Sequence, residues 1–538
     1  MTGRVREAIP VEEADGPWLA LGVAAACVAV GVYLATNAYP AYGAGLYAQI
    51  AAEIAANGYR PPATIPGYTA EGVPFAYPPL QFYVFAVLLD AGADPVAVAR
   101  LLPSVAVVAV AVPAYLLGRD VVGSRPAGAA AAALLAVNPQ VLEWHVSAGG
   151  VVRAFAFLYA MCSVYAGYRA YTTSSRRAVV ASAVAFGLTA LSHPTYALFV
   201  VVSHVVAWAT LDRSPSGFLR GLAVGLAGTA IAAPWLAWAA ATHGPGVFAA
   251  AAGTHGGVGG GGAAALAGEI SPFTLVPLAA AAYLLARGDR FLPAWVVAAE
   301  LVFAQPRFAY TVGTLAVVAV AVDLGDRVDD RSLASVAGSL PRSLATATPT
   351  RAESMGSSRS RSSPSVRAAL AAALVVCATV GGAAALGYEM TLEGDPSSPA
   401  FVDGDDREAM AWIASETPPE ATFVAVGDAA EWLPALTDRT LLVGPWGVEW
   451  RSPDDYERHF DAYEALSTCH SAACVEAAAA TVDASPTHVY LPKRRYTVRG
   501  ESTVTFGTLA RSFERADGWT RAYENDGVVV YRVADDEE

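Results

Sequence analysis

Two acidic residues, Glu71 and Glu143, stand next to apolar segments of the chain, where a carboxylate can do chemistry at a membrane surface. A charged group at the edge of hydrocarbon is costly, so it usually has a partner or a function. A carboxylate can take a proton from a hydroxyl group as a general base, and we expect Glu71 and Glu143 to be the catalytic residues. The alternatives are simple solvation of Glu71 in a loop and a structural ion pair between Glu143 and Arg153.

Five further residues near the same ends of the apolar segments are candidates for substrate binding. Arginine forms charge-assisted hydrogen bonds to phosphates, and histidine and tyrosine add polar contacts. Simpler roles are open for two of them, since His193 can be a hydrogen bonder at a helix end and Arg307 can anchor to lipid phosphate. The candidates are Tyr77, His145, Arg153, His193 and Arg307.

The composition is that of a membrane protein. Hydrophobic residues make up 55% of the 538 residues and charged residues only 15%, a balance outside the usual range of soluble proteins. The segment "PWLALGVAAACVAVGVYLAT" (17–36) supplies the roughly 20 apolar residues that a spanning helix needs. We interpret it as an uncleaved first span, with a cleaved signal peptide as the alternative. The net charge of −14 comes mostly from the C-terminal segment, which disfavours nucleic acid as a partner.

Arginine predicts the orientation of the spans. Short connections rich in arginine concentrate on the cytoplasmic side, and "GRDVVGSRP", "YRAYTTSSRR", "LDRSPSGFLR" and "ARGDR" fall at every second connection. If the first span runs outward, only one crossing fits before "GRDVVGSRP". The shorter segment 78–92 is therefore expected to lie at the outer interface; alternatively, it crosses and one later segment does not. The other apolar segments are 97–117, 126–142, 151–170, 178–192, 195–211, 219–239, 271–286, 291–305, 307–322 and 368–388.

The expected fold is thus a polytopic α-helical membrane protein of about eleven spans plus an interfacial helix, followed by an extracytoplasmic α/β domain. In the last segment, "ATFVAVGD" and "RTLLVGP" have the pattern of strands, and the Asn525–Gly527 stretch predicts a hairpin. We expect a cell-membrane, multi-pass protein. Its parts are a cytoplasmic N-terminus (1–16), a multi-span domain (17–322) with a first outer loop (37–96), a disordered cytoplasmic linker (323–367), a last transmembrane helix (368–388) and the extracytoplasmic domain (390–538).

Two of the five cysteines, Cys469 and Cys474, lie together in "CHSAAC". They can form a disulfide if this segment is outside the cell. A zinc site is the weaker alternative, because only His470 is nearby and three ligands leave the coordination sphere incomplete.

Several short motifs resemble the GT-C class of membrane glycosyltransferases, which includes protein O-mannosyltransferases, aminoarabinose transferases and oligosaccharyltransferase catalytic subunits. The motifs are the helix pattern "GLYAQIAAEIAANGY" in the first loop, the "YPPL" that begins a short helix, an "RL" in the next span and an "NP" near the end of the following one. "AMAWIASETPP", "EWLPAL" and "GVEW" in the C-terminal segment look like the extracytoplasmic domain of archaeal members.

The resemblance implies a hexosyltransferase-type enzyme with a polyprenyl-phosphate sugar donor such as a dolichyl phosphate, a catalytic carboxylate in the first loop, and transfer to a glycan or protein acceptor on the outer face. A divalent metal ion is a candidate cofactor, although we predict no metal ligands. Such enzymes usually place an acid shortly before the tyrosine of the first-loop helix, but this chain has Gly43, Ala44 and Gly45 before Tyr47. Either Glu71 or Glu143 has taken the catalytic role, or the protein is divergent or inactive.

Two other functions remain open. A secondary transporter places ionisable groups near the membrane midplane, commonly in two related halves, whereas the polar residues here gather at the outer ends of the spans. A non-enzymatic surface-assembly or sensing protein would use the C-terminal domain to bind a partner, and the missing first-loop acid is consistent with this alternative.

Overall fold

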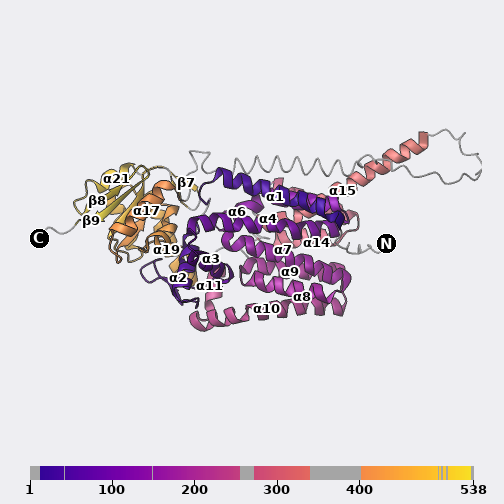
Figure 1. The fold of residues 1–538 in the computed structure, drawn as a ribbon, viewed down its shortest axis with the longest axis horizontal. Helices are drawn as coiled ribbons and strands as arrows, with labels where there is room; N and C mark the ends of the chain where they lie inside the picture. Colours follow the sequence, from indigo (N-terminus) through magenta and orange to yellow (C-terminus); the bar gives the residue numbers. More distant parts are fainter. Residues whose placement is uncertain are drawn as a thin grey trace, which may run out of the picture.

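The computed structural model describes residues 13–40, 43–147, 149–254, 272–303, 305–339, 402–494, 496–498, 501–503 and 507–534. Within these ranges, long helices lie side by side in a bundle, and an α/β unit covers one end of it (Figure 1). We call residues 402–534 the tail unit. Residues 340–401, which include the predicted last span 368–388 and most of the predicted linker, lie outside the described residues.

Six of the described helical segments are long and apolar enough to cross a membrane, namely Glu13–Thr36, Pro95–Val122, Gly150–Thr173, Pro194–Leu211, Pro215–His243 and Pro306–Arg327. The count of about eleven spans stays a prediction. The bundle contains η1 (Glu13–Asp15), α1 (Gly16–Thr36), α4 (Pro95–Val122), α5 (Arg125–Ala136), α6 (Pro139–Val146), α7 (Gly150–Thr173), α8 (Arg176–Ala190), α9 (Pro194–Leu211), α10 (Pro215–His243), α11 (Gly246–Thr254), α13 (Pro272–Ala286), α14 (Phe291–Val302) and α15 (Pro306–Ser339).

Two boundaries differ from the sequence prediction. The segment 126–142 is not one helix, because α5 ends at Ala136 and α6 starts at Pro139; proline lacks an amide N–H and disfavours a helical conformation in the residue before it. The linker was expected to begin at 323, but α15 continues to Ser339. Asp323 explains part of this extension, because it forms ion pairs with Arg287 and, one helical turn later, Arg327.

The first loop contains α2 (Gly45–Ala56), the short antiparallel strands β1 (Thr64–Ile65) and β2 (Val73–Pro74), and α3 (Leu80–Asp90). With 11 residues, α3 is only about 16 Å long, roughly half the thickness of the hydrocarbon core. It is therefore too short to cross. The two helices pack against each other, with the rings of Tyr47 and Phe82 5.5 Å apart.

The arginine-rich connections all lie at the end of the bundle away from the tail unit, as the course of the chain in Figure 1 shows. The connection between α4 and α5 contains a buried ion-pair network. Arg119 and Asp120 have no exposed side-chain surface, and Arg119 bonds both Asp120, at 2.7 Å, and Asp15, at 2.9 Å. Arg125 adds a contact to Asp15, and Arg169 one to Asp120. This network fixes the start of α1 to the neighbouring helices.

The tail unit is built on a five-stranded sheet in the order β4-β3-β5-β9-β8. Strands β3 (Thr422–Ala425), β4 (Thr440–Leu441) and β5 (His488–Pro492) are parallel, whereas β9 (Val528–Val533) is antiparallel to β5 and to β8 (Trp519–Glu524). Asn525–Gly527 connect β8 and β9, as the sequence predicts. Around the sheet lie α17 (Gly404–Glu416), η3 (Asp428–Trp432), α18 (Leu433–Thr437), η4 (Val448–Trp450), α19 (Pro453–Thr468), α20 (Ala472–Ala480), the hairpin of β6 (Tyr496–Val498) and β7 (Glu501–Thr503), and α21 (Gly507–Phe513).

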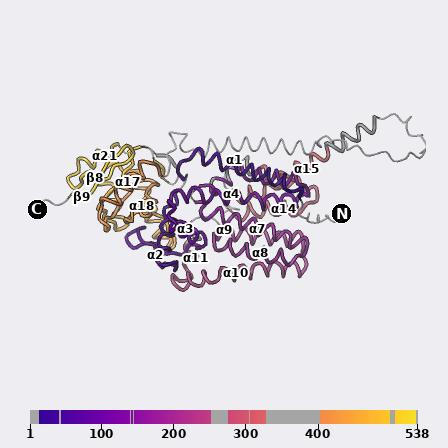
Figure 2. The backbone as a smooth tube through the Cα atoms, in the orientation of Figure 1, coloured from indigo at the N-terminus to yellow at the C-terminus, as the bar shows by residue number. Residues whose placement is uncertain are grey.

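The tail unit is joined to the first loop by main-chain hydrogen bonds as well as by packing. The Thr69 N–H donates to the Leu441 carbonyl at 2.7 Å, and the Leu441 N–H donates to the Gly67 carbonyl at 2.8 Å. One continuous apolar core holds residues from α2, α3, α17 and the sheet. The backbone in Figure 2 shows α2 close to α18 of the tail unit, and the two helices are in contact. Loop and tail therefore form a single packed body on the bundle.

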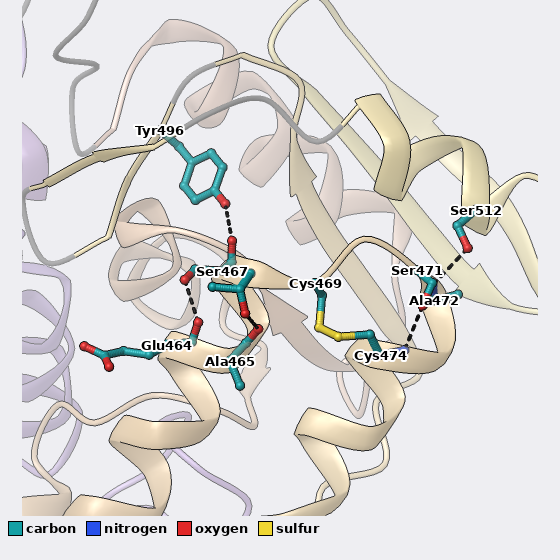
Figure 3. Close-up of a disulfide and its surroundings, with 10 residues drawn as sticks. Glu464, Ala465, Ser467, Cys469, Ser471, Ala472, Cys474, Tyr496 and Ser512 are labelled. Carbon is teal, nitrogen blue, oxygen red and sulfur yellow. Dashed lines mark hydrogen bonds between the residues drawn. A yellow bond between two sulfur atoms is a disulfide. The ribbon is translucent and has the colours of Figure 1, made fainter.

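A disulfide joins Cys469, after α19, to Cys474 in α20 (Figure 3). The Tyr496 hydroxyl donates to the Ser467 carbonyl beside it, at 3.2 Å. Thus the two thiols of "CHSAAC" pair with each other, and the zinc alternative loses its ligands. Within the described ranges, no group of three or more His, Cys, Asp or Glu side chains is arranged to hold a metal ion.

Candidate functional site

An aromatic cluster lies where the first loop, the start of α9 and the tail unit meet. Tyr77, from the loop before α3, is its centre. Its ring centroid lies 5.9 Å from that of Tyr47 in α2, 5.6 Å from Phe82 in α3, 5.8 Å from His193 and 5.8 Å from Trp450 in η4. The aromatic rings therefore come from elements that are separate in the sequence.

Two arginines lie beside these rings, each in the first turn of a bundle helix. Arg153 in α7 is half-buried, and its guanidinium lies 5.2 Å from the ring centre of Trp144. Arg307 in α15 is 7% exposed, and its guanidinium lies 5.7 Å from the ring of Tyr196 and 5.2 Å from that of Phe308. Aromatic faces can hold a guanidinium in place without neutralising its charge.

Neither arginine forms an ion pair with a carboxylate among the side chains that the structure describes. Arg307 donates from Nη2 to the Gln305 amide oxygen at 2.7 Å, but its buried Nε has no hydrogen-bond partner there. The two guanidiniums are close enough for their charges to repel. A buried and a half-buried cation that lie close together, one of them with a free donor, are arranged to receive an anion.

His145 and His193 complete this arrangement. His145 in α6 is buried, its Nδ1 bonds the Val141 carbonyl and its Nε2 lies 2.6 Å from the Tyr196 hydroxyl. Because a carbonyl only accepts, Nδ1 carries the proton and Tyr196 donates to Nε2. His193 caps α9, accepting from the Thr195 N–H at 3.3 Å, while its ring lies 5.2 Å from that of Tyr196. It is thus both a helix cap and part of the cluster.

Tyr196, which the sequence analysis missed, contacts three of the five predicted binding residues, His145, His193 and Arg307. Tyr77 joins them through the His193 ring, and the charge of Arg153 reaches the Tyr196 hydroxyl. We call Tyr47, Tyr77, His145, Arg153, His193, Tyr196, Arg307 and Trp450 the arginine–aromatic cluster. Neither of the two predicted catalytic acids is found in this cluster among the described side chains. The Glu71 side chain is 82% exposed and pairs with Arg451 at 3.2 Å, outside the cluster. Glu143 lies in α6, but its side chain is outside the described part of the structure.

Two acids that the sequence analysis also missed come from the tail unit, the buried Glu431 and the half-buried Glu449. Glu431 in η3 is 7% exposed, and it accepts hydrogen bonds from the main-chain N–H groups of Gly45 and Leu46 at the start of α2. Burial and the nearby Asp428 raise the pKa of Glu431 to about 8. Burial raises the pKa of Glu449, in η4, to about 7.

Glycines make room for Glu431. A Cβ atom on Gly43 would lie 1.9 Å from the Glu431 Oε2 atom, and one on Gly45 would lie 1.8 Å from its main-chain oxygen. Any side chain at these positions would collide with Glu431. The "GAG" sequence before Tyr47 is the one local signal of this contact, but it does not say which residue, far along the chain, fills the space.

No protein-family model matches this chain, and no curated protein sequence matches it significantly. Solved structures do match. ArnT from Cupriavidus metallidurans bound to undecaprenyl phosphate has a TM-score of 0.53 at 16% identity, covering 96% of this chain and 98% of that one. The Archaeoglobus fulgidus oligosaccharyltransferase in complex with Zn and sulfate has a TM-score of 0.50 at 13% identity, covering 90% and 73%.

The arabinofuranosyltransferase AftD from Mycobacteria has a TM-score of 0.52 at 16% identity; the match covers 99% of this chain and 41% of AftD. These likenesses show that the chain has the fold of GT-C membrane glycosyltransferases.

Proposed function

We propose that this protein transfers a sugar from a polyprenyl-phosphate donor to a glycan or protein acceptor on the outer face of the cell membrane. The observation that carries the proposal is the pair Arg153 and Arg307, two adjacent guanidiniums without a carboxylate partner among the described residues. Sugar transfer from such a donor releases a lipid phosphate, and fixed cations that stabilise this leaving group would lower the barrier.

The rest of the arginine–aromatic cluster suits the same donor. Tyr77 and His193 lie between the arginines and the tail unit, where they can contact the sugar. The pair His145 and Tyr196 holds the ring beside Arg307 in place. The short helix α3 is too short to cross the membrane, and at the interface it can shape the groove that admits the lipid. The similarity to ArnT, solved with undecaprenyl phosphate, agrees with a polyprenyl lipid as the partner.

Two observations support the proposed outer-face location. The arginine-rich connections share the end of the bundle opposite the tail unit (Figure 1), and such connections favour the cytoplasmic side. Disulfides form and persist mainly in oxidising surroundings, and the tail unit contains the Cys469–Cys474 pair. Both observations support a tail unit, and a cluster next to it, on the outer side of the membrane.

Glu71 and Glu143 are the acids that the sequence proposes for catalysis, and each can be tested by substitution with glutamine. A divalent ion does not fit the described side chains, which contain no metal-binding group of three or more ligands.

The experiment measures binding of undecaprenyl phosphate to the purified full-length protein in nanodiscs, together with transfer of a labelled sugar from polyprenyl-phosphate donors. We expect Arg153→Gln and Arg307→Gln each to weaken binding by about tenfold or more, the effect of losing one charge-assisted contact. Arg307→Lys keeps the charge, so its affinity for undecaprenyl phosphate should lie between that of the wild type and that of Arg307→Gln. Arg60→Gln is the control, because Arg60 is an exposed arginine of the same loop. Unchanged binding in both glutamine variants would overturn the proposal.

A further inference from the structure

We propose that Glu431, contributed by the tail unit, is the carboxylate that takes the proton from the acceptor hydroxyl during sugar transfer. The inference rests on the proposed function and deepens it, because it assigns the acid–base step to a residue far in sequence from the first loop. It also predicts that the tail unit is part of the catalytic machinery rather than a separate binding module.

The position of Glu431 supports this role. Its Oε2 atom occupies the space that the Cβ atom of a larger residue at position 43 would take. A carboxylate of the tail unit therefore lies where a side chain of the first loop would otherwise start. The main-chain N–H groups of Gly45 and Leu46 hold the carboxylate, and the Tyr68 hydroxyl donates to its main-chain oxygen. A carboxylate fixed in this way keeps one orientation, as a general base must.

The surroundings of Glu431 connect it to the arginine–aromatic cluster. Its charge interacts with the guanidinium of Arg153 and with the hydroxyl of Tyr47. Arg153 also interacts with the charge of Arg307, whereas Arg307 is not among the main groups that act on the charge of Glu431. Arg153 is thus the group shared by the proposed base and the proposed phosphate site, and a general base near the phosphate site is what attack of a hydroxyl on the bound donor requires.

The chemistry balances with the donor and acceptor alone. The acceptor oxygen forms a bond to the anomeric carbon of the sugar, and its proton moves to the Glu431 carboxylate. The bond between that carbon and the phosphate oxygen breaks, and its electron pair leaves with the polyprenyl phosphate beside Arg153 and Arg307. The proton on Glu431 then returns to solvent before the next turnover.

The acidity of Glu431 agrees with this role, since a general base works best when its pKa lies near the working pH. Burial and Asp428 raise the pKa of this carboxyl to about 8, against the lowering effects of the two N–H donors and of Arg153. Because the base must be deprotonated, kcat/KM should rise with pH through about 8. The titratable and charged groups around Glu431 are Asp428, Tyr47, Tyr68, Arg153 and Tyr463.

Glu449 is the rival for the same role. It interacts with Tyr47 and Tyr77, and its buried Oε2 has no hydrogen-bond partner among the described residues. Main-chain N–H groups orient both acids, since Glu449 accepts from Gly447 and from its own N–H. Glu431 is favoured because its charge reaches Arg153. The two acids can be separated by experiment, since each can be changed to glutamine without a change in size.

The first experiment compares Glu431→Gln with Glu449→Gln in the full-length protein. Glutamine still accepts the N–H bonds at the start of α2, so the fold should be kept. We expect Glu431→Gln to lower kcat about 100-fold or more, the usual contribution of a general base, and to abolish the rise of kcat/KM with pH. Undecaprenyl phosphate binding and the unfolding temperature should stay unchanged, and Glu449→Gln should keep kcat within about threefold, because neutralising a residue that takes no part in the transition state leaves the barrier in place.

The second experiment moves the carboxylate. A Cβ on residue 43 would lie 2.7 Å from the carboxyl carbon of Glu431, and Gly43 is not one of the described glycines with positive φ. In the Glu431→Ala background, Gly43→Asp therefore places a new carboxylate close to the lost one. We expect the double variant to recover at least about tenfold of the activity lost in Glu431→Ala, since proximity restores proton transfer.

The outcomes separate this inference from the proposed function. Full activity of Glu431→Gln, or loss of activity in Glu449→Gln alone, would overturn the role of Glu431 while leaving the donor site intact. If Glu431→Gln unfolds at lower temperature and loses lipid binding, and Gly43→Asp does not rescue Glu431→Ala, then Glu431 has only a structural role at the start of α2. Failure of the wild-type protein to bind undecaprenyl phosphate would instead overturn the proposed function.

Discussion

The guanidinium of Arg407 donates two hydrogen bonds, 3.0 and 2.7 Å long, to the two carboxylate oxygens of Asp94. Asp94 is the N-cap of α4 and also accepts the Ala97 N–H at 2.8 Å. One carboxylate therefore ends the first loop, starts a bundle helix and holds α17 of the tail unit. These contacts keep the pKa of Asp94 below its usual value despite partial burial.

Breaking this pair should loosen the tail unit only moderately. Both side chains are more than a third exposed, so solvent screens the pair and we expect Arg407→Ala to cost about 0.5–1 kcal/mol. Chemical denaturation of Arg407→Ala, Asp94→Asn and the double variant forms a double-mutant cycle that isolates the coupling. If the two substitutions change the free energy of unfolding additively, the Arg407–Asp94 ion pair does not stabilise the protein, and Asp94 acts only as the cap of α4.

A single methyl group at residue 45 should separate the first loop from the tail unit. In Gly45→Ala the new Cβ would lie 1.8 Å from the main-chain oxygen of Glu431, and backbone on both sides leaves no flexible atom to move. We expect limited proteolysis to cut the first loop or the tail unit faster in this variant. Gly31→Ala is the matched control, because its Cβ meets no atom within 4 Å; equal cleavage of the two would contradict the contact.

The sequence predicted the parts of the fold that depend on local patterns. Alternating arginine-rich connections indicated which connections lie at the same end of the bundle, the double proline before Leu80 marked the start of a short helix, and Asn525–Gly527 marked a hairpin. Local patterns also indicated the ends of α7, α9 and α15, where Arg153, His193 and Arg307 lie. These residues meet because each stands in or just before the first turn of a helix that starts at the same end of the bundle.

Contacts between residues that are far apart in the chain could not be predicted from local sequence patterns. Glu431 lies within a short 3-10 helix whose residues resemble any amphipathic surface turn, and nothing local says that α2 receives its carboxylate. Tyr196 was hidden for a similar reason, since a tyrosine in an apolar helix usually serves packing. The sequence does show Asn138 and Pro139, a pair that commonly interrupts a helix. The segment 126–142 is nevertheless predicted as one span because most of its residues are apolar.

The tail unit should become less stable as pH rises, in a way that depends on Asp406. Burial and the neighbouring Asp403 raise the pKa of Asp406 from 3.8 to about 7. The folded state thus binds this proton more tightly than the unfolded state, so its stabilising effect is complete below about pH 4 and is lost as pH rises through about 7. We expect the unfolding temperature of the wild type, relative to Asp406→Asn, to fall between pH 5 and pH 8. A pH-independent difference would contradict this assignment.

The Cys469–Cys474 pair offers a test of both stability and location. Its loop is short, so the double serine variant should lose only about 2 kcal/mol on a chain-entropy estimate. Alkylation under denaturing but non-reducing conditions should label three of the five cysteines in the wild type, since two are paired. After reduction, a membrane-impermeant thiol reagent applied to intact cells should label the tail unit. Labelling only after the membrane is opened would place this unit in the cytoplasm.

The buried network at the opposite end of the bundle should respond far more strongly than the surface pairs. Arg119→Leu removes a guanidinium with no exposed surface and leaves the carboxylates of Asp15 and Asp120 buried with a missing counter-charge. Removing one partner of a buried pair typically costs about 3–5 kcal/mol. The control is Arg220→Leu, because the Arg220–Asp212 pair is about one-fifth exposed and solvent can replace the lost partner. Thermal unfolding in detergent should therefore shift markedly for the first variant and little for the second, and equal shifts would mean that the network adds no more than a surface pair.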